Sequence, residues 1–154
     1  MGTRYSAGFS RAGINTANSP VANLNQTGTT ARLYVVEVGV GIAVAPTTAP
    51  AFYLSRATAR GTQTATLAGQ AADPSEPSAI GTLDTTWSVN PTFSTSNYLR
   101  FGGLATTAGG FLVWTFYDNP IVVNATSGLG LTLANANASG ATTGTFTGYF
   151  AWDE

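Results

Sequence analysis

The run LYVVEVGVGIAVA, residues 33–45, constrains the fold of this chain more than any other segment. Every even-numbered position from Tyr34 to Val44 carries a large apolar side chain, whereas the odd-numbered positions include Glu37, Gly39 and Gly41. Period-two alternation with many β-branched residues is typical of a β-strand. We therefore predict a strand that begins near residue 34 and ends before the two prolines of APTTAP.

Similar short runs continue to the end of the chain, among them AFYLSRAT, GTLDTTWSV and TGTFTGYFAW. They are separated by stretches of turn residues such as QAADPSEPS and NANASGATTG. Apolar residues do not recur at helical spacing in any window of helical length. We predict about eight or nine short strands over residues 31–154, arranged as an antiparallel β-sandwich or jelly roll.

The segment GFLVWTFYD has large apolar side chains at both odd and even positions. Such a strand is expected to be buried on both sides. One side would face the core of the sandwich, and the other would need a loop, a neighbouring element or a second subunit to cover it. This pattern is a first indication of oligomerisation.

The composition narrows the classes of function. Only 8% of the residues are charged, all six basic residues are arginine, and the net charge is −1. Nucleic-acid binding normally needs clustered cations, so we expect no nucleic-acid partner. The beginning of the sequence lacks an apolar signal segment, and the run at 33–45 is too short to span a bilayer. We expect a soluble protein with no membrane contact.

The chain contains no histidine and no cysteine. This excludes the common nucleophilic triads and makes a zinc site untenable. A glycosidase built on two carboxylates is the one familiar enzyme class that the composition allows. However, Asp73 with Glu76 and Asp153 with Glu154 fit solvated charges in a turn and at a chain end. We therefore predict no enzymatic activity, no catalytic residue, no metal site and no cofactor.

Aromatic residues could form a platform for a sugar, and Trp87, Trp114, Tyr117 and Trp152 are the candidates. Trp114 and Trp152 share their strand faces with other large apolar residues, which favours the core over a ligand site. Trp87 lies on a more polar strand, so an exposed contact and ordinary packing are both open for it.

The first 29 residues, rich in Gly, Ala, Asn, Ser and Thr, are too polar to suggest a core strand. They nevertheless include Arg4, Tyr5, Phe9 and Arg11. We interpret residues 1–29 as an extended N-terminal arm in which these four residues bind a partner, with residues 30–154 as the jelly-roll domain. A frayed tail without function is the alternative.

Several segments together suggest a family. They are the VEVGVG strand, the LDTTWSV segment, GGFLVWTFYDNPIVV, and the ending GLGLTLANANASGATTGTFTGYFAWDE. The chain resembles the small jelly-roll cement, or decoration, proteins on the heads of tailed bacteriophages, cyanophages among them. The resemblance spans most of residues 30–154, and its motifs are loose.

The resemblance implies a homotrimer on the outer surface of the virion capsid, made in the host cytoplasm. Its partner would be the major capsid protein, with N-terminal arms reaching across seams in the shell, and it would stabilise the shell without catalysis. A carbohydrate-binding jelly-roll module of a tail fibre or adsorption apparatus is the alternative, and a carboxylate-dependent glycosidase is a more distant one.

Overall fold

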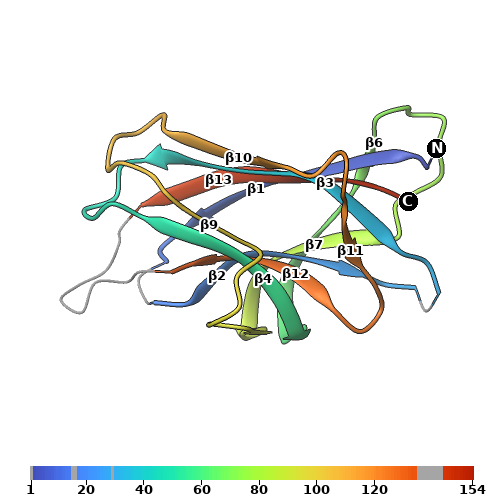
Figure 1. The fold of residues 1–154 in the computed structure, drawn as a ribbon, viewed down its shortest axis with the longest axis horizontal. Helices are drawn as coiled ribbons and strands as arrows, with labels where there is room; N and C mark the ends of the chain where they lie inside the picture. Colours follow the sequence, from blue (N-terminus) through green and yellow to red (C-terminus); the bar gives the residue numbers. More distant parts are fainter. Residues whose placement is uncertain (1, 15–16, 29, 135–143) are drawn as a thin grey trace.

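The computed structural model describes residues 2–14, 17–28, 30–134 and 144–154. These residues form thirteen β-strands in two antiparallel sheets that pack face to face (Figure 1). Sheet A contains, in spatial order, β10 (Phe111–Thr115), β3 (Leu33–Val44), β13 (Thr145–Asp153), β1 (Arg4–Ala12) and β6 (Gln70–Ala71), with β11 (Ile121–Val123) also paired to β3. Sheet B contains β5 (Thr62–Ala68), β7 (Gly81–Val89), β2 (Ser19–Gln26), β12 (Gly128–Leu133), β4 (Ala51–Ala59) and β8 (Thr92–Phe93), with β9 (Arg100–Gly103) paired to β4.

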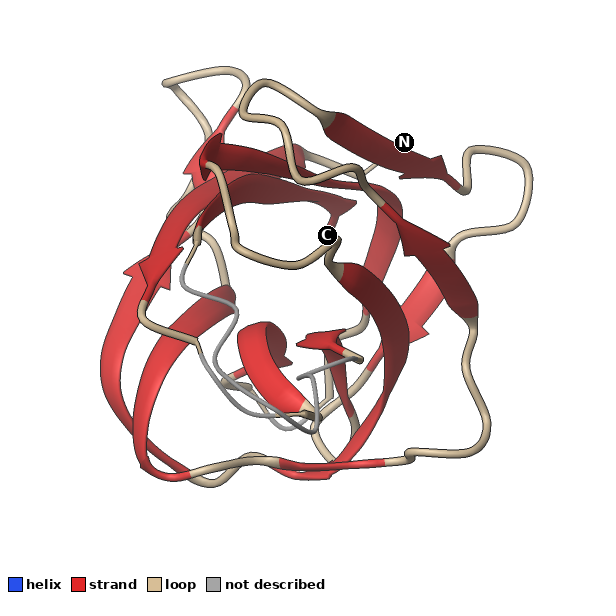
Figure 2. Cartoon of the chain, turned by 90° about the vertical axis from the view of Figure 1, so that its left-hand side faces the viewer, coloured by secondary structure: helices blue, strands red, loops and turns tan. Residues whose placement is uncertain are grey.

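The prediction of an all-β sandwich is confirmed. Within the described ranges the chain forms no helix, and hence no helix long and apolar enough to cross a membrane. Seen end-on in Figure 2, the strands of the two sheets curve around a common interior. The core between them contains large aromatic side chains, including Phe52, Phe146, Phe150 and Trp152, each fully buried. Burial of such apolar surface is the main favourable contribution to folding.

Strand β3 changes face partway along its length. Val35 is paired with Trp152 and Glu37 with Ala151, so Val36 is an extra residue between them. This bulge puts Leu33 and Val35 on the core side together with the even-numbered residues from 38 to 42. The period-two pattern therefore predicted the strand, but its assignment of residues to two continuous faces was wrong before position 37 and at Val44, which follows a second register shift and is 55% exposed.

The predicted N-terminal arm is wrong. Residues 4–12 form β1, which pairs with β13 over its whole length, from Arg4 opposite Asp153 to Ala12 opposite Thr145 (Figure 1). Tyr5 and Phe9 belong to the core cluster, with 2% and 6% of their surface exposed. The reason is that RYSAGFSRA itself alternates: its larger apolar side chains point inward, and its small or polar ones point outward.

The predicted boundary between an arm and a domain at residues 29 and 30 is also wrong. Strand β2 lies inside sheet B, between β7 and β12, and is buried along nearly all of its length. The described part of residues 2–28 thus contributes one central strand to each sheet. Residues 4–26 belong to the same sandwich as the rest of the chain.

Candidate binding face on sheet A

The outer face of sheet A carries a group of exposed aromatic and aliphatic side chains. We define the aromatic face as the exposed Phe111, Val113 and Tyr117 together with the partly buried Tyr149. The exposed fractions of Phe111, Val113 and Tyr117 are 51%, 42% and 57%. Strand β10, predicted to be buried on both sides, therefore has an uncovered side in the single chain.

Two glycines of β3 allow aromatic rings to lie flat against the sheet. Phe111 and Val113 are paired with Gly41 and Gly39 on the neighbouring strand. A Cβ atom at Gly39 would lie 2.6 Å from the Tyr149 ring and 2.9 Å from the Phe111 ring, distances that real Cβ atoms do not adopt. The Phe111 and Tyr149 rings are stacked with centroids 6.2 Å apart and planes 18° apart. Because Gly39 and Gly41 have no side chains, the two rings can occupy the space above them.

Glu37 lies between two tyrosines at the centre of this surface. The Tyr117 hydroxyl donates to its Oε2 atom over 2.8 Å, and the Tyr149 hydroxyl donates to its Oε1 atom. These hydrogen bonds, the one from Tyr149 foremost, lower the pKa of Glu37, and the charge of Arg4 adds to them. Burial, together with the hydrogen bond to Glu37, raises the pKa of Tyr149 to about 12. The carboxylate therefore stays ionised and the phenols stay neutral near neutral pH.

Arg4 and Asp153, which lie beside the aromatic face, are paired with each other. Arg4 forms an ion pair with Asp153, the residue opposite it in the register of β1 and β13. The hydrogen bond to Asp153 is the main reason that the pKa of Arg4 is raised. The Arg4 guanidinium carbon also lies 6.0 Å from the centre of the Tyr117 ring. Arg4, Asp153 and Glu37 thus each have a partner within the same chain.

The residues predicted for partner binding do not come together. Arg4 lies beside the aromatic face, but Tyr5 is stacked on Trp152 and donates its hydroxyl to the Pro77 carbonyl over 2.9 Å. Phe9 is in the core. Arg11 is partly buried, and its Nε atom has no hydrogen-bond partner among the described residues. A partner-binding role for Tyr5 and Phe9 is incompatible with their burial.

Trp87, for which an exposed contact and ordinary packing were both open, is partly exposed. It lies in β7, and its indole Nε1 atom is buried without a hydrogen-bond partner in the described part of the chain. Trp152 is fully buried, as predicted, whereas Trp114 is partly buried and packs against the edge of the core. Of the four sugar-platform candidates, Tyr117 is the one that lies on the aromatic face.

The two pairs of neighbouring carboxylates have structural partners. Asp73 accepts hydrogen bonds from the backbone N–H and hydroxyl of Ser75, which confirms its prediction as a turn residue. Glu154 is not a solvated end charge as predicted, because its carboxylate accepts from the backbone N–H groups of Ile80 and Gly81 and from the indole of Trp152. It holds the end of β13 against the start of β7.

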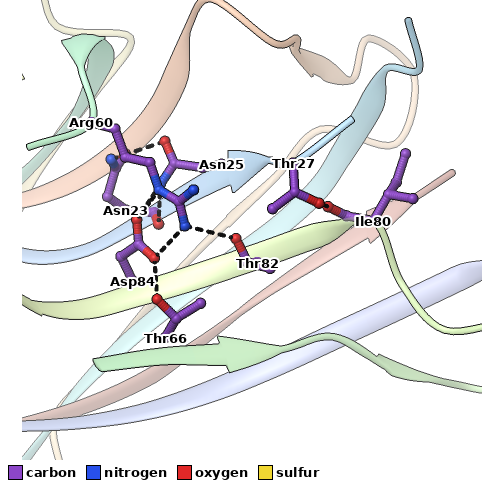
Figure 3. A network of polar contacts seen from close by, with 8 residues as sticks. All are labelled: Asn23, Asn25, Thr27, Arg60, Thr66, Ile80, Thr82 and Asp84. Atoms are coloured by element: carbon purple, nitrogen blue, oxygen red, sulfur yellow. Dashed lines mark hydrogen bonds and ion pairs between the residues drawn. The ribbon is translucent and has the colours of Figure 1, made fainter. Parts of the chain in front are cut away.

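Sheet B contains a buried polar network centred on Asp84 (Figure 3). Asp84 is fully buried and accepts hydrogen bonds from Arg60 through Nε and Nη2, at 2.7 and 2.9 Å. The side chains of Asn25 and Thr66 donate to the same carboxylate, each over 2.7 Å. These partners come from β2, β5 and the turn after β4. Both carboxylate oxygens of Asp84 thus accept hydrogen bonds within the chain. We therefore assign this network a structural role, which is to hold these elements together.

Glu37, Phe111 and Tyr149 were not predicted to share one surface. Glu37 is the one charged residue in an otherwise apolar and glycine-rich strand, and this was a usable signal. Bringing Tyr149 next to it required the pairing of β3 with β13, which is 112 residues away along the chain. Among the residues that the structure describes, no group of three or more acidic side chains could hold a metal ion.

Comparison with known proteins gave no family for this chain. No protein-family model matches it, and no curated protein matches its sequence at a significant level.

Proposed function

We propose that this protein is a structural component of a tailed-phage virion, a cement protein that binds the assembled shell of major capsid protein as a homotrimer. In this proposal the aromatic face is the contact between copies. Residues 1–29, which were predicted to grip the capsid as an arm, contribute β1 and β2 to the sandwich, and the burial of Tyr5 and Phe9 excludes these two as contacts. Attachment to the shell would use exposed surface of the sandwich.

One observation carries the self-association part of the proposal. The aromatic face exposes large apolar side chains, while Glu37, Arg4 and Asp153 beside it already have partners within the chain. Burial of an unpaired charge in an interface is costly, whereas a compensated charge beside aromatic rings is compatible with burial. In a homotrimer, a three-fold axis next to the aromatic face would bring this weakly charged surface of each chain together with those of its two neighbours.

The capsid part of the proposal rests on the resemblance of residues 30–154 to phage cement proteins. The sandwich architecture agrees with that resemblance at the level of fold class. A fold class alone does not imply a function, so this part needs a direct binding test.

Native mass spectrometry and sedimentation with undecorated phage heads test the two parts. We expect a species of three times the 15.8 kDa chain mass, and co-sedimentation of that species with heads. Phe111→Glu places a charge in the proposed interface and should shift the protein towards monomer. Val89→Glu is the matched control, because Val89 is 60% exposed in sheet B.

The two parts fail separately. A wild-type protein that stays monomeric over the whole accessible concentration range contradicts the interface. A trimer that never sediments with heads contradicts the capsid assignment and leaves the interface intact.

Carbohydrate binding is the second candidate function. The stacked rings of Phe111 and Tyr149 make the aromatic face the best place for such a site. An exposed aromatic ring such as Phe111 can stack on a sugar ring, and the nearby Glu37 carboxylate can accept hydrogen bonds from the sugar hydroxyl groups. In that case a glycan screen should yield ligands whose binding is lost in Phe111→Ala. A screen without ligands for a protein that is monomeric removes this candidate.

A further inference from the structure

A cleft with two arginines opens at the side of the sandwich. It has a volume of about 330 Å³ and lies next to β11 and the end of β4. Its walls combine the two arginines with apolar residues: Arg56, Leu99, Arg100, Phe116, Pro120 and Ile121. We call it the lateral cleft. A second hollow of about 240 Å³ adjoins it and shares Arg100 and Phe116.

Within the described part of the chain, neither arginine has an acidic partner. Among the described residues the ion pairs are Arg4 with Asp153 and Arg60 with Asp84. Arg56 donates from Nη1 to the backbone carbonyl of Val122, and burial lowers its pKa. A guanidinium has five N–H donors in a planar fork, so a single carbonyl leaves most of that capacity unused.

Arg100 is held in place from two directions. Its guanidinium carbon lies 4.9 Å from the centre of the Phe116 ring, and its Nη1 atom donates to the Leu99 carbonyl over 2.7 Å. Two guanidinium groups that reach the same apolar-walled cleft create a positive potential there. An anion would compensate the cost of keeping Arg56 away from water.

We propose that the lateral cleft binds the carboxylate of an Asp or Glu side chain that a neighbouring protein chain presents next to an apolar residue. A carboxylate matches the planar fork of a guanidinium and accepts two parallel hydrogen bonds. The apolar residue would pack on Leu99, Pro120 and Ile121.

The surroundings favour one carboxylate over a phosphate chain. Asp118 lines the adjoining hollow, and its charge would repel a ligand that carries several negative charges. Nucleic acid needs a row of cations, but Arg4 and Arg60 are already paired and Arg32 lines a different cleft. This proposal goes beyond the capsid function and does not depend on it.

The test follows the side-chain Nε–Hε signals of the arginines by NMR in the isolated, full-length protein. The probes are the dipeptide acetyl-Leu-Glu-amide, its uncharged match acetyl-Leu-Gln-amide, and inorganic phosphate at equal ionic strength. We expect the Glu peptide to shift Arg56 and Arg100 in a saturable way and to leave Arg32 unchanged. The Gln peptide lacks the charge and should bind at least about tenfold more weakly. Phosphate lacks the apolar side chain and is repelled by Asp118, so it should also bind more weakly than the Glu peptide.

Variants locate the site. Arg100→Gln should lower the affinity for the Glu peptide by about tenfold. Arg32→Gln is the matched control and should leave this affinity unchanged. Arg100 is exposed, so this variant is expected to fold even if Arg56→Gln does not. Equal shifts at Arg32 and in the cleft, equal binding of the two peptides, or tighter binding of phosphate would each overturn the proposal. Because no phage head is used, the result is independent of the test of the proposed function.

Discussion

At the scale of single residues, Glu37 shows how one charge is accommodated on a largely apolar surface. Its carboxylate accepts two tyrosine hydroxyls, which arrive from β13 and from the segment after β10. A hydrogen bond to an ionised group contributes more than one between neutral groups. This arrangement is stable only while the carboxylate is ionised and the phenols keep their protons.

Replacement of Glu37 by Gln should therefore destabilise the protein in a pH-dependent way. The pKa of Glu37 is lower in the folded chain than its ordinary value of 4.5, so its contribution is present above pH 4.5. That contribution is lost as the pH falls through the folded pKa. We expect a loss of about 1–2 kcal/mol near neutral pH and a vanishing difference in acid, measured by urea unfolding over a pH series.

The tyrosine side of the same cluster gives a second limit to that pH range. Because the pKa of Tyr149 is raised to about 12, its contribution is present below the ordinary value of 10.0 and is lost as the pH rises through 12. Tyr149→Phe keeps the ring and removes only the hydroxyl, so it is the control that isolates the hydrogen bond to Glu37. A difference between wild type and Glu37→Gln that is the same at all pH values would contradict this account.

At the scale of elements, β1 is the strand for which the prediction and the structure differ most. It has three buried side chains, of which only Tyr5 and Phe9 are large, and its outward side chains are small or polar. An isolated segment of this kind gives a weak strand signal. Its position is decided by nine consecutive pairs with β13, together with the packing of Tyr5 against Trp152.

Phe9→Ala should accordingly destabilise the fold by about 3–5 kcal/mol, because it removes a buried aromatic ring from the core. Ser10→Ala is the control on the same strand, and its exposed side chain should change the stability by no more than about 0.5 kcal/mol. Thermal or denaturant unfolding measures both. Removal of residues 1–13 should prevent folding, whereas a truncated chain with unchanged unfolding would restore the picture of a separate arm.

At the scale of the whole molecule, the described ends of the chain lie side by side. The backbone N–H of Thr3 donates to the Glu154 carbonyl, and the N–H of Glu154 donates to the Thr3 carbonyl, over 3.1 and 3.0 Å. Both ends are therefore part of sheet A (Figure 1). Closure of the sandwich depends on contacts between residues far apart in the sequence.

A circular permutant tests this organisation. A short glycine-rich linker between the present ends, with a new opening at the exposed turn between Thr106 and Thr107, should keep the fold, because no paired strand is cut. An opening between Val40 and Gly41, inside the buried part of β3, is the matched control and should prevent folding. Circular dichroism and thermal unfolding report both results. Failure of the first permutant with success of the second would contradict the topology.

The local pattern of side chains determined that this chain forms short strands and turns, and that these strands pair in a sandwich. Period-two alternation around Val38 and Val40 is a property of neighbouring residues, so it can be read without a structure. The same holds for Asp73, whose turn is made with Ser75 two residues away.

Only the tertiary structure decided which strands are neighbours, where β3 changes face, and which side chains share a surface. The bulge at Val36 is visible only in the register with β13, and the contacts of Glu37 and Arg56 join residues 112 and 66 positions apart. Such contacts depend on the free energy of the whole sandwich and not on local preference. For the same reason a strand with few apolar residues, β1, could be mistaken for an arm.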